Sequence, residues 1–198
     1  MQTALRPCEA LALRWKDVDL EAASVRVHHS LVRVRGIKGW RLEEPKTKNA
    51  IRTVPLPGAT ARELRAWQTR QQWQRRVAQA TWEEHGFVFT NATGGPLDSV
   101  RRSFTRVSAK AGLGTWGEEP TRTHRTGPLP ARRLTPAFHP YSCRHTCITL
   151  WVKHGVPIHV VSKLAGHATT AFTLTVYTHA LPEQQLEAAA VQDQMFGT

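Results

Sequence analysis

The chain has 198 residues and a mass of 22.2 kDa, the size of one ordinary domain. Its 27 lysines and arginines outnumber 15 aspartates and glutamates, and the net charge of +12 is typical of proteins that meet a polyanion such as nucleic acid. No apolar run is long enough for a membrane helix, no secretory signal is present, and the three cysteines show no disulfide framework. These features predict a soluble, cytoplasmic protein with reduced thiols.

The first half of the chain predicts a short helix, a small sheet and a long helix. Residues 7–16 have helical periodicity, and a proline at the start suits a first turn. Apolar and polar residues then alternate in three stretches that glycines and polar turns separate. This pattern predicts three antiparallel strands over 24–34, 40–46 and 51–56. Residues 59–82 predict a long amphipathic helix that is rich in arginine and glutamine.

The second half is mostly helical by the same criteria, apart from one long segment. A short extended piece over 86–91 precedes a basic helix over 97–112. Residues 114–137 are rich in glycine, proline, threonine and arginine without periodicity, and they predict an exposed loop. Further helices are expected over 141–155, 157–166 and 182–196. The predicted fold class is α+β, mainly α, with a small three-stranded antiparallel sheet.

Two arginines stand in helical segments with apolar neighbours. A guanidinium in such a place is costly unless it holds an anion, so Arg6 and Arg144 are candidates for binding a polyanion. The ordinary explanation is that each arginine pairs with a nearby acid, such as Glu9.

Three further residues put a cation or a nucleophile within reach of a polyanion. Lys46 lies on the turn between two predicted strands, where its ammonium can point outward. His167 and Tyr177 stand ten residues apart in a segment of threonines and small apolar residues, with a helix expected to carry the tyrosine. Taken one at a time, a turn lysine is usually solvated and a helical tyrosine usually belongs to the core.

The order and flanks of these residues resemble the tyrosine recombinase (phage integrase) family over essentially the whole chain. LRPCEALALRW resembles the first arginine box, PKTK followed by RTVPL the lysine hairpin, and CRHTCITL the second arginine box. LAGH resembles the histidine box and TVYTH the nucleophile box, with the family's ten-residue step between them. Five boxes in family order are far more specific than any single motif. The resemblance implies the helical DNA breaking-rejoining fold.

The resemblance also implies a function, namely site-specific cleavage and rejoining of double-stranded DNA through a 3′-phosphotyrosine intermediate, without metal, nucleotide or other cofactor. Tyr177 would attack the phosphorus, and Arg6 and Arg144 would hold the non-bridging oxygens. Lys46 would protonate the departing 5′-oxygen, and His167 would hydrogen-bond and orient the phosphate.

One departure from the family pattern concerns the position three residues before Arg144, which is usually histidine and is Tyr141 here. His139 lies five residues before Arg144 and is out of register. A phenol, with a pKa of about 10, is a weak base at neutral pH, so Tyr141 is a candidate for hydrogen-bonding the phosphate or the nucleophile. His145 is expected to pack or cap locally.

A second departure concerns the start of the chain. Integrases of this type carry an N-terminal DNA-clamping domain and further helices before the first arginine box, which here begins five residues after Met1. The resemblance therefore implies that residues 1–198 form a catalytic domain that is incomplete at its N-terminus. The helix over 182–196 would dock on a neighbouring protomer and build a homotetramer on DNA.

Three other functions remain open at this point. A metal hydrolase would use a group of thiols and imidazoles, although no second ligand pair stands at a zinc spacing; these residues are Cys143, His145, Cys147, His154 and His159. A non-catalytic DNA-binding remnant would keep the basic surface and lose strand cleavage. A type IB topoisomerase shares the chemistry, but the boxes are integrase-like and the chain is short.

Overall fold

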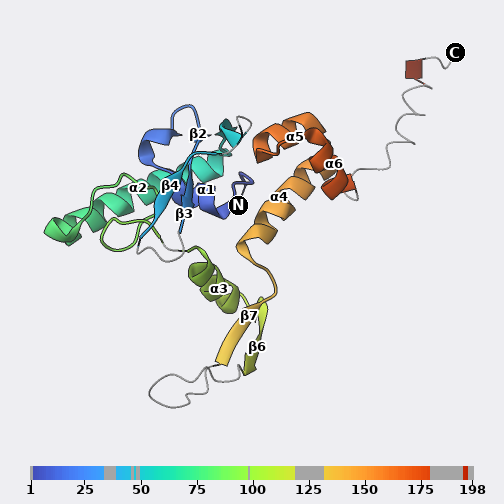
Figure 1. The fold of residues 1–198 in the computed structure, drawn as a ribbon. Helices are drawn as coiled ribbons and strands as arrows, with labels where there is room; N and C mark the ends of the chain where they lie inside the picture. Colours follow the sequence, from blue (N-terminus) through green and yellow to red (C-terminus); the bar gives the residue numbers. More distant parts are fainter. Residues whose placement is uncertain are drawn as a thin grey trace.

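The computed structural model describes residues 2–33, 39–45, 47, 50–97, 99–118, 132–178 and 194–195, without the side chains of 102, 115–118 and 132–136. The fold is mainly helical with small antiparallel sheets, as the sequence predicts (Figure 1). The helices are α1 (Pro7–Ala12), η1 (Trp15–Asp17), α2 (Gly58–Ala78), η3 (Gln79–Thr81), α3 (Arg101–Lys110), α4 (Pro140–Lys153), α5 (Ile158–Ala165) and α6 (Thr170–Tyr177). The strands are β1 (Val18–Asp19), β2 (Ser24–Val27), β3 (Ser30–Val32), β4 (Arg41–Glu43), β5 (Arg52–Pro55), β6 (Gly114–Glu118) and β7 (Arg132–Pro136).

The three-stranded sheet has the order β1-β2-β5 and is antiparallel throughout. Its inner face is made by alternate residues, and Val25 lies opposite Val54 in the register. Val25, Val27 and Val54 are each 1% exposed, because residues two apart on a strand face the same side. This valine face packs against Leu13, Leu56 and Ala61 to form the first hydrophobic core.

The predicted single strand over 24–34 is wrong, because the structure breaks it at His28 and His29 into β2 and β3. The imidazole Nε2 of His28 lies 2.9 Å from Oδ1 of Asp17, so this side chain bonds with η1 where the pairing changes. Strand β3 pairs with β4 in a separate two-stranded sheet, while β2 pairs with β5. The third strand of the main sheet is β1, which the sequence did not predict.

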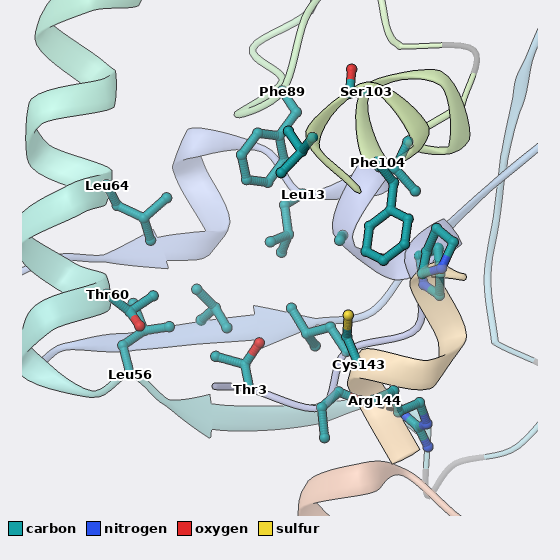
Figure 2. Close-up of a pocket in the computed structure, with 18 residues that line it drawn as sticks. Thr3, Leu13, Leu56, Thr60, Leu64, Phe89, Ser103, Phe104, Cys143 and Arg144 are labelled. Atoms are coloured by element: carbon teal, nitrogen blue, oxygen red, sulfur yellow. Dashed lines mark hydrogen bonds between the residues drawn. The ribbon is translucent and has the colours of Figure 1, made fainter. Parts of the chain in front are cut away.

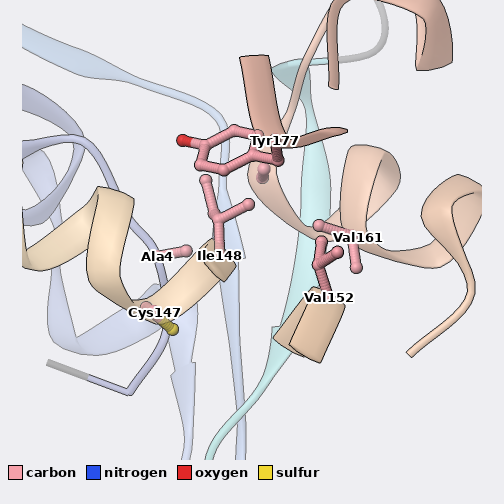
Figure 3. Close-up of a cluster of buried hydrophobic side chains, with 7 residues drawn as sticks. Ala4, Cys147, Ile148, Val152, Val161 and Tyr177 are labelled. Atoms are coloured by element: carbon pink, nitrogen blue, oxygen red, sulfur yellow. The ribbon is translucent and has the colours of Figure 1, made fainter. Parts of the chain in front are cut away.

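The second hydrophobic core joins α4, α5 and α6 and includes the tyrosine of the nucleophile box. Figure 3 shows the ring of Tyr177 beside Ile148 of α4, with Val152 and Val161 next to each other in the same cluster. Tyr177 is 2% exposed, and Ile148 and Val161 are fully buried. The predicted helices over 141–155 and 157–166 are confirmed by α4 and α5.

The expectation of an exposed loop over 114–137 is wrong at both ends. Strands β6 and β7 pair as an antiparallel hairpin, from Gly114 opposite Pro136 to Glu118 opposite Arg132. Backbone N–H and C=O groups pair in such a ladder without needing apolar alternation, so the sequence pattern does not reveal it. Residues 119–131 lie outside the described part of the chain.

Figure 1 shows α1 and α2 gathered around the main sheet, with α4, α5 and α6 forming a second group. The N-terminal segment before α1 links the two groups, since Ala4 belongs to the second core. No helix in the described ranges is long and apolar enough to cross a membrane. The predicted helix over 182–196 falls almost entirely on residues outside the described ranges, so it stays a prediction.

Candidate active site

Arg6 stands at the start of α1, where the chain turns into the helix. Its backbone N–H donates to Oε2 of Glu9 at 2.8 Å, and its guanidinium donates to Oε1 of the same residue at 2.7 Å. A second guanidinium nitrogen donates to the carbonyl of Gly166 at 3.0 Å. Arg6 is thus held by an acid on its own helix and by the backbone that precedes His167. About a third of its side chain stays exposed (30%).

Arg144 lies on α4 and is 5% exposed. Its two terminal nitrogens donate to the backbone carbonyl of Ala4 and, at 2.6 Å, to that of Ala165. Burial, with the nearby charges of Arg6 and Arg52, lowers the pKa of Arg144 to about 10, although Glu9 partly opposes this. The guanidinium is still charged at neutral pH. A guanidinium has five N–H donors, so these two bonds fix its orientation and leave donors for an anion.

Arg52 of β5 is a third buried guanidinium, and sequence reasoning missed it. It is 6% exposed and donates to both carboxylate oxygens of Glu9, at 2.8 and 3.1 Å, and to the carbonyl of Leu164 at 2.7 Å. A signal was present in the sequence, because Arg52 stands two residues before Val54. On a strand this spacing places the charged side chain on the same inward face as the core valine.

One carboxylate therefore bonds two guanidiniums and acts electrostatically on a third. Glu9 is 4% exposed, and although burial raises its pKa, the hydrogen bonds and charge of Arg52 and the bonds from Arg6 hold that pKa below its ordinary value. Glu9 is thus ionised, and it contributes a single negative charge beside Arg6, Arg52 and Arg144. The cluster keeps an excess of positive charge in a largely buried place, which favours binding of an anion.

His167 follows the α5 terminus at Gly166 and is 7% exposed. Its Nδ1 lies 2.7 Å from the hydroxyl oxygen of Thr173, and its backbone N–H donates to the carbonyl of Ser162 at 3.0 Å. Burial, followed by the positive charge of Arg144, lowers the pKa of His167 to about 4. The ring is neutral at physiological pH. When the Thr173 hydroxyl donates to Nδ1, the ring proton lies on Nε2 and can be donated to an anion.

Tyr177 ends α6 with its ring nearly parallel to that of His167, at 13° and 6.4 Å between centroids. Its hydroxyl oxygen lies 2.8 Å from Nδ1 of His145 on α4. Burial raises the pKa of Tyr177, while the charge of Arg144 partly offsets this effect. The phenol is therefore protonated at neutral pH and is electrostatically coupled to the arginine cluster.

The structure thus brings Arg6, Arg144, His167 and Tyr177 together at the junction of α1, α4, α5 and α6. Tyr141 lies in the first turn of α4 with 43% of its surface exposed, outside this buried cluster. Lys46 lies outside the described residues, so its role stays a prediction.

His145, which the sequence predicts to pack or cap locally rather than act on DNA, makes a contact with a residue far along the chain. It stands next to Arg144 on an exposed position of α4 and contacts the Tyr177 hydroxyl from there. Nothing in the local sequence signals this contact, because it depends on how α6 packs against α4.

Gly166 makes the close approach of these elements possible. Its φ of +66° is left-handed, and a Cβ added there would lie 2.6 Å from a guanidinium nitrogen of Arg52. Gly155 has a similar φ of +74° with nothing within 4 Å, so it is a matched control. We expect Gly155→Ala to lower the free energy of unfolding by about 1 kcal/mol and Gly166→Ala by about 2–4 kcal/mol, because only the second adds a steric overlap. Chemical denaturation measures both, and equal losses would contradict the close packing on Arg52.

A mainly apolar pocket of about 480 Å³ lies beside the charged cluster. Figure 2 shows it between Leu64 of α2, Leu13, Phe104 of α3 and Cys143 of α4, with Arg144 at one edge. For the metal-hydrolase alternative, no group of three or more His, Cys, Asp or Glu side chains that could hold a metal ion occurs in the described part of the chain.

Comparison with known proteins places this arrangement in a family. Residues 1–184 match the model of the phage integrase family. A tyrosine recombinase XerC-like protein of Caldanaerobacter subterraneus subsp. tengcongensis is 31% identical over an alignment of 206 residues. The alignment covers 98% of this chain and 47% of that protein. An integrase of Streptomyces ambofaciens is 34% identical over 157 residues, which cover 77% of this chain and 35% of that protein. The chain spans half or less of the length of these relatives.

Solved structures share the fold. The Tn1549 transposon integrase in complex with transposon right end DNA has a TM-score of 0.68 and 21% identity, over 100% of this chain and 56% of that one. The XerA recombinase has a TM-score of 0.58 and 20% identity, over 96% of this chain and 53% of that one. With the family model matching nearly the full length and a relative above 30% identity, the chain belongs to the phage integrase family.

Proposed function

We propose that this chain is the catalytic part of a site-specific recombinase that cleaves and rejoins double-stranded DNA through a 3′-phosphotyrosine intermediate. The proposal rests on one arrangement, in which the Tyr177 hydroxyl stands beside a buried cluster of guanidiniums with excess positive charge. A phosphodiester carries one negative charge, which offsets part of this excess. A tyrosine hydroxyl next to such a site is placed to attack the phosphorus.

The reaction is a transesterification that conserves bond energy. The Tyr177 oxygen forms a bond to phosphorus as the bond from phosphorus to the 5′-oxygen breaks, and attack by a 5′-hydroxyl later reverses the exchange. Negative charge grows on the non-bridging oxygens in the transition state, and Arg6 and Arg144 meet it with donors that are already oriented by backbone carbonyls. Because this orientation exists before DNA binds, little reorganisation is needed during the reaction.

Two further roles complete the proposed mechanism. His167, neutral and held by Thr173, donates a hydrogen bond to the phosphate and orients it. Lys46 protonates the departing 5′-oxygen; this role is supported by the family resemblance of the segment that contains it.

Strand cleavage is tested with a library of nicked duplexes whose flanking sequence is randomised, since the nick lets the short 5′-ended fragment leave and traps the intermediate. We expect an adduct that resists denaturant, is removed by protease, and maps to Tyr177 through the 3′-phosphate. DNA binding without any adduct across the library would contradict the proposal and favour a non-catalytic DNA-binding protein.

DNA binding is expected to be mainly electrostatic. The long helix α2 and the helix α3 carry exposed arginines along the chain, namely Arg62, Arg65, Arg70, Arg75, Arg76, Arg101 and Arg106. Arg102 belongs to the same predicted set, and its side chain is outside the described part. If six phosphates are contacted, duplex affinity falls about 10³-fold between about 50 and 200 mM salt. Fluorescence anisotropy measures this slope, and an affinity that does not change with salt would rule the interpretation out.

We further propose that the protein acts as a homotetramer on DNA through the segment over 182–196. Its Leu186, Val191 and Phe196 would supply an apolar contact to a neighbouring protomer. Deleting residues 183–198 should leave the folded core and DNA binding intact but reduce the assembly to protomers bound singly. Sedimentation of the DNA complex measures this, and unchanged assembly after deletion would show that the segment docks on its own core or not at all.

A further inference from the structure

We propose that His145 is a catalytic residue, whose Nδ1 takes the hydroxyl proton of Tyr177 during attack on phosphorus and returns it during rejoining. This inference rests on the proposed function of Tyr177 as the nucleophile. It assigns a role that neither the family boxes nor the comparisons give to this position.

The contact itself spans two helices. Nδ1 of His145 on α4 and the hydroxyl oxygen of Tyr177 at the end of α6 are 2.8 Å apart, and the ring planes meet at 37° with centroids 5.9 Å apart. This is hydrogen-bond distance between a hydroxyl and an imidazole nitrogen. In the tautomer with its proton on Nε2, a neutral imidazole accepts at Nδ1, and the Tyr177 hydroxyl can then donate its proton to the group that would remove it.

The two side chains differ in their access to water, which suits a proton acceptor. Tyr177 is 2% exposed, whereas His145 stands on an exposed position of α4. A proton taken at Nδ1 can therefore be balanced by loss of the Nε2 proton to solvent. The buried phenol has no comparable exchange with bulk water at its own position.

The neighbouring groups are poorer bases. Burial raises the pKa of Tyr177, so its proton must be removed for efficient attack. His167 has a pKa lowered to about 4 by burial and by the charge of Arg144, which makes its ring a weak acceptor. Arg144 stays protonated, and Tyr141 is an exposed phenol at the position that the family usually fills with histidine. His145 is the imidazole whose ring nitrogen lies within hydrogen-bond distance of the Tyr177 hydroxyl.

The proposed step balances in protons and bonds. The Tyr177 oxygen–phosphorus bond forms, the phosphorus–5′-oxygen bond breaks, and the phenolic proton passes to Nδ1 of His145. The 5′-oxygen receives its proton from Lys46 in the proposed mechanism and leaves as a hydroxyl. On rejoining, the 5′-hydroxyl attacks and gives its proton back to Lys46, and Nδ1 of His145 returns a proton to the departing tyrosine oxygen.

The surrounding charges tie this proton transfer to bound DNA. The charged or titratable groups near the pair are Arg144 on the same helix, His167 beside α6, Arg6 and Glu9 at α1 and Arg52 on β5, and Glu9 is the acid among them. An imidazolium next to these guanidiniums is unfavourable until a phosphate adds negative charge to the site. Transfer is therefore expected to proceed only with a phosphodiester in place.

The test compares single-turnover cleavage by wild type and His145→Asn on a nicked substrate recovered from the library, between pH 5 and pH 9. Asparagine keeps a hydrogen-bonding group near Nδ1 but cannot accept the proton. We expect a rate lower by about 10²–10⁴-fold, with duplex affinity unchanged and with loss of the pH dependence that the wild-type rate shows. His154→Asn is the matched control, because His154 is an exposed histidine at the end of the same helix. Its rate and pH profile should equal those of wild type.

A second measurement needs no DNA. The chain has two tyrosines, so Tyr141→Phe leaves Tyr177 as the single tyrosine, and a ¹³C label at Cζ reports on its hydroxyl by NMR. We expect this signal to depend on pH through the contact with His145, and to stay flat over the same pH range when His145→Asn is added.

The outcomes separate this inference from the proposed function. A Tyr177 signal that ignores His145, or a His145→Asn protein that cleaves at the wild-type rate, overturns the role of His145 while an adduct at Tyr177 stands. If wild type forms no adduct, both proposals fail together, and a persisting NMR response then shows that the contact exists without the chemistry. Loss of rate with loss of the pH inflection, while His154→Asn is unaffected, supports the proposal.

Discussion

Tyr177→Phe is expected to abolish the covalent DNA adduct completely while leaving the fold and duplex binding intact. The substitution removes the oxygen that would bond to phosphorus, and no other atom of the ring can replace it. The phenylalanine ring keeps the apolar contacts with the cluster around Ile148. The substitution removes the hydrogen bond to His145, an exposed side chain that water can satisfy, and loss of such a bond lowers the free energy of unfolding by about 0.5–1.5 kcal/mol.

Three measurements on the same protein check this result. Denaturing electrophoresis with labelled DNA measures the adduct, anisotropy measures duplex affinity, and chemical denaturation measures stability. An adduct that persists in Tyr177→Phe and maps by mass spectrometry to Tyr141 would overturn the assignment of the nucleophile. Loss of folding along with the adduct would instead show that the hydroxyl is needed for the core.

The helices were predictable because their periodicity is local. The structure confirms the segments over 59–82, 141–155 and 157–166 as α2, α4 and α5; α4 buries Cys147, Ile148 and Val152, and α5 buries Val161 and Ala165. The sheet was less predictable, since apolar residues alternate on both sides of His28 and His29 and no glycine or proline marks a break between them. The interruption depends on a tertiary contact of His28 with Asp17, which no local rule contains.

The candidate site shows the same division. Motif order alone nominated Arg6, Arg144, His167 and Tyr177, residues that the structure places around one cluster, although their catalytic roles remain predictions. The contacts of Arg52 and His145 were not predictable in the same way. Arg52 donates across the fold to Glu9 and Leu164, and His145 meets a residue 32 positions later in the chain. Such contacts are set by how helices and strands pack, so only the three-dimensional arrangement reveals them.

Arg144→Lys has the second large expected effect, because the substitution keeps the charge and loses the geometry. The two terminal nitrogens of Arg144 reach two different backbone carbonyls, those of Ala4 and Ala165. An ammonium is a single point and cannot bond both while also facing a phosphate. One buried carbonyl loses its donor, which costs about 1–3 kcal/mol in the free energy of unfolding.

The effect on cleavage should exceed the effect on stability. A lysine at this position has no second nitrogen to place against the oxygens that gain charge in the transition state, and losing one oriented donor of this kind lowers a rate by about 10²–10³-fold. Duplex affinity should be nearly retained, because the net charge of the protein is unchanged.

Arg26→Lys is the matched control, since Arg26 is an exposed arginine on β2 away from the cluster. Single-turnover cleavage and anisotropy separate the two quantities. Wild-type cleavage by Arg144→Lys would show that charge alone suffices at this position, whereas a parallel loss of cleavage and of duplex affinity would show that Arg144 serves ground-state binding rather than the transition state.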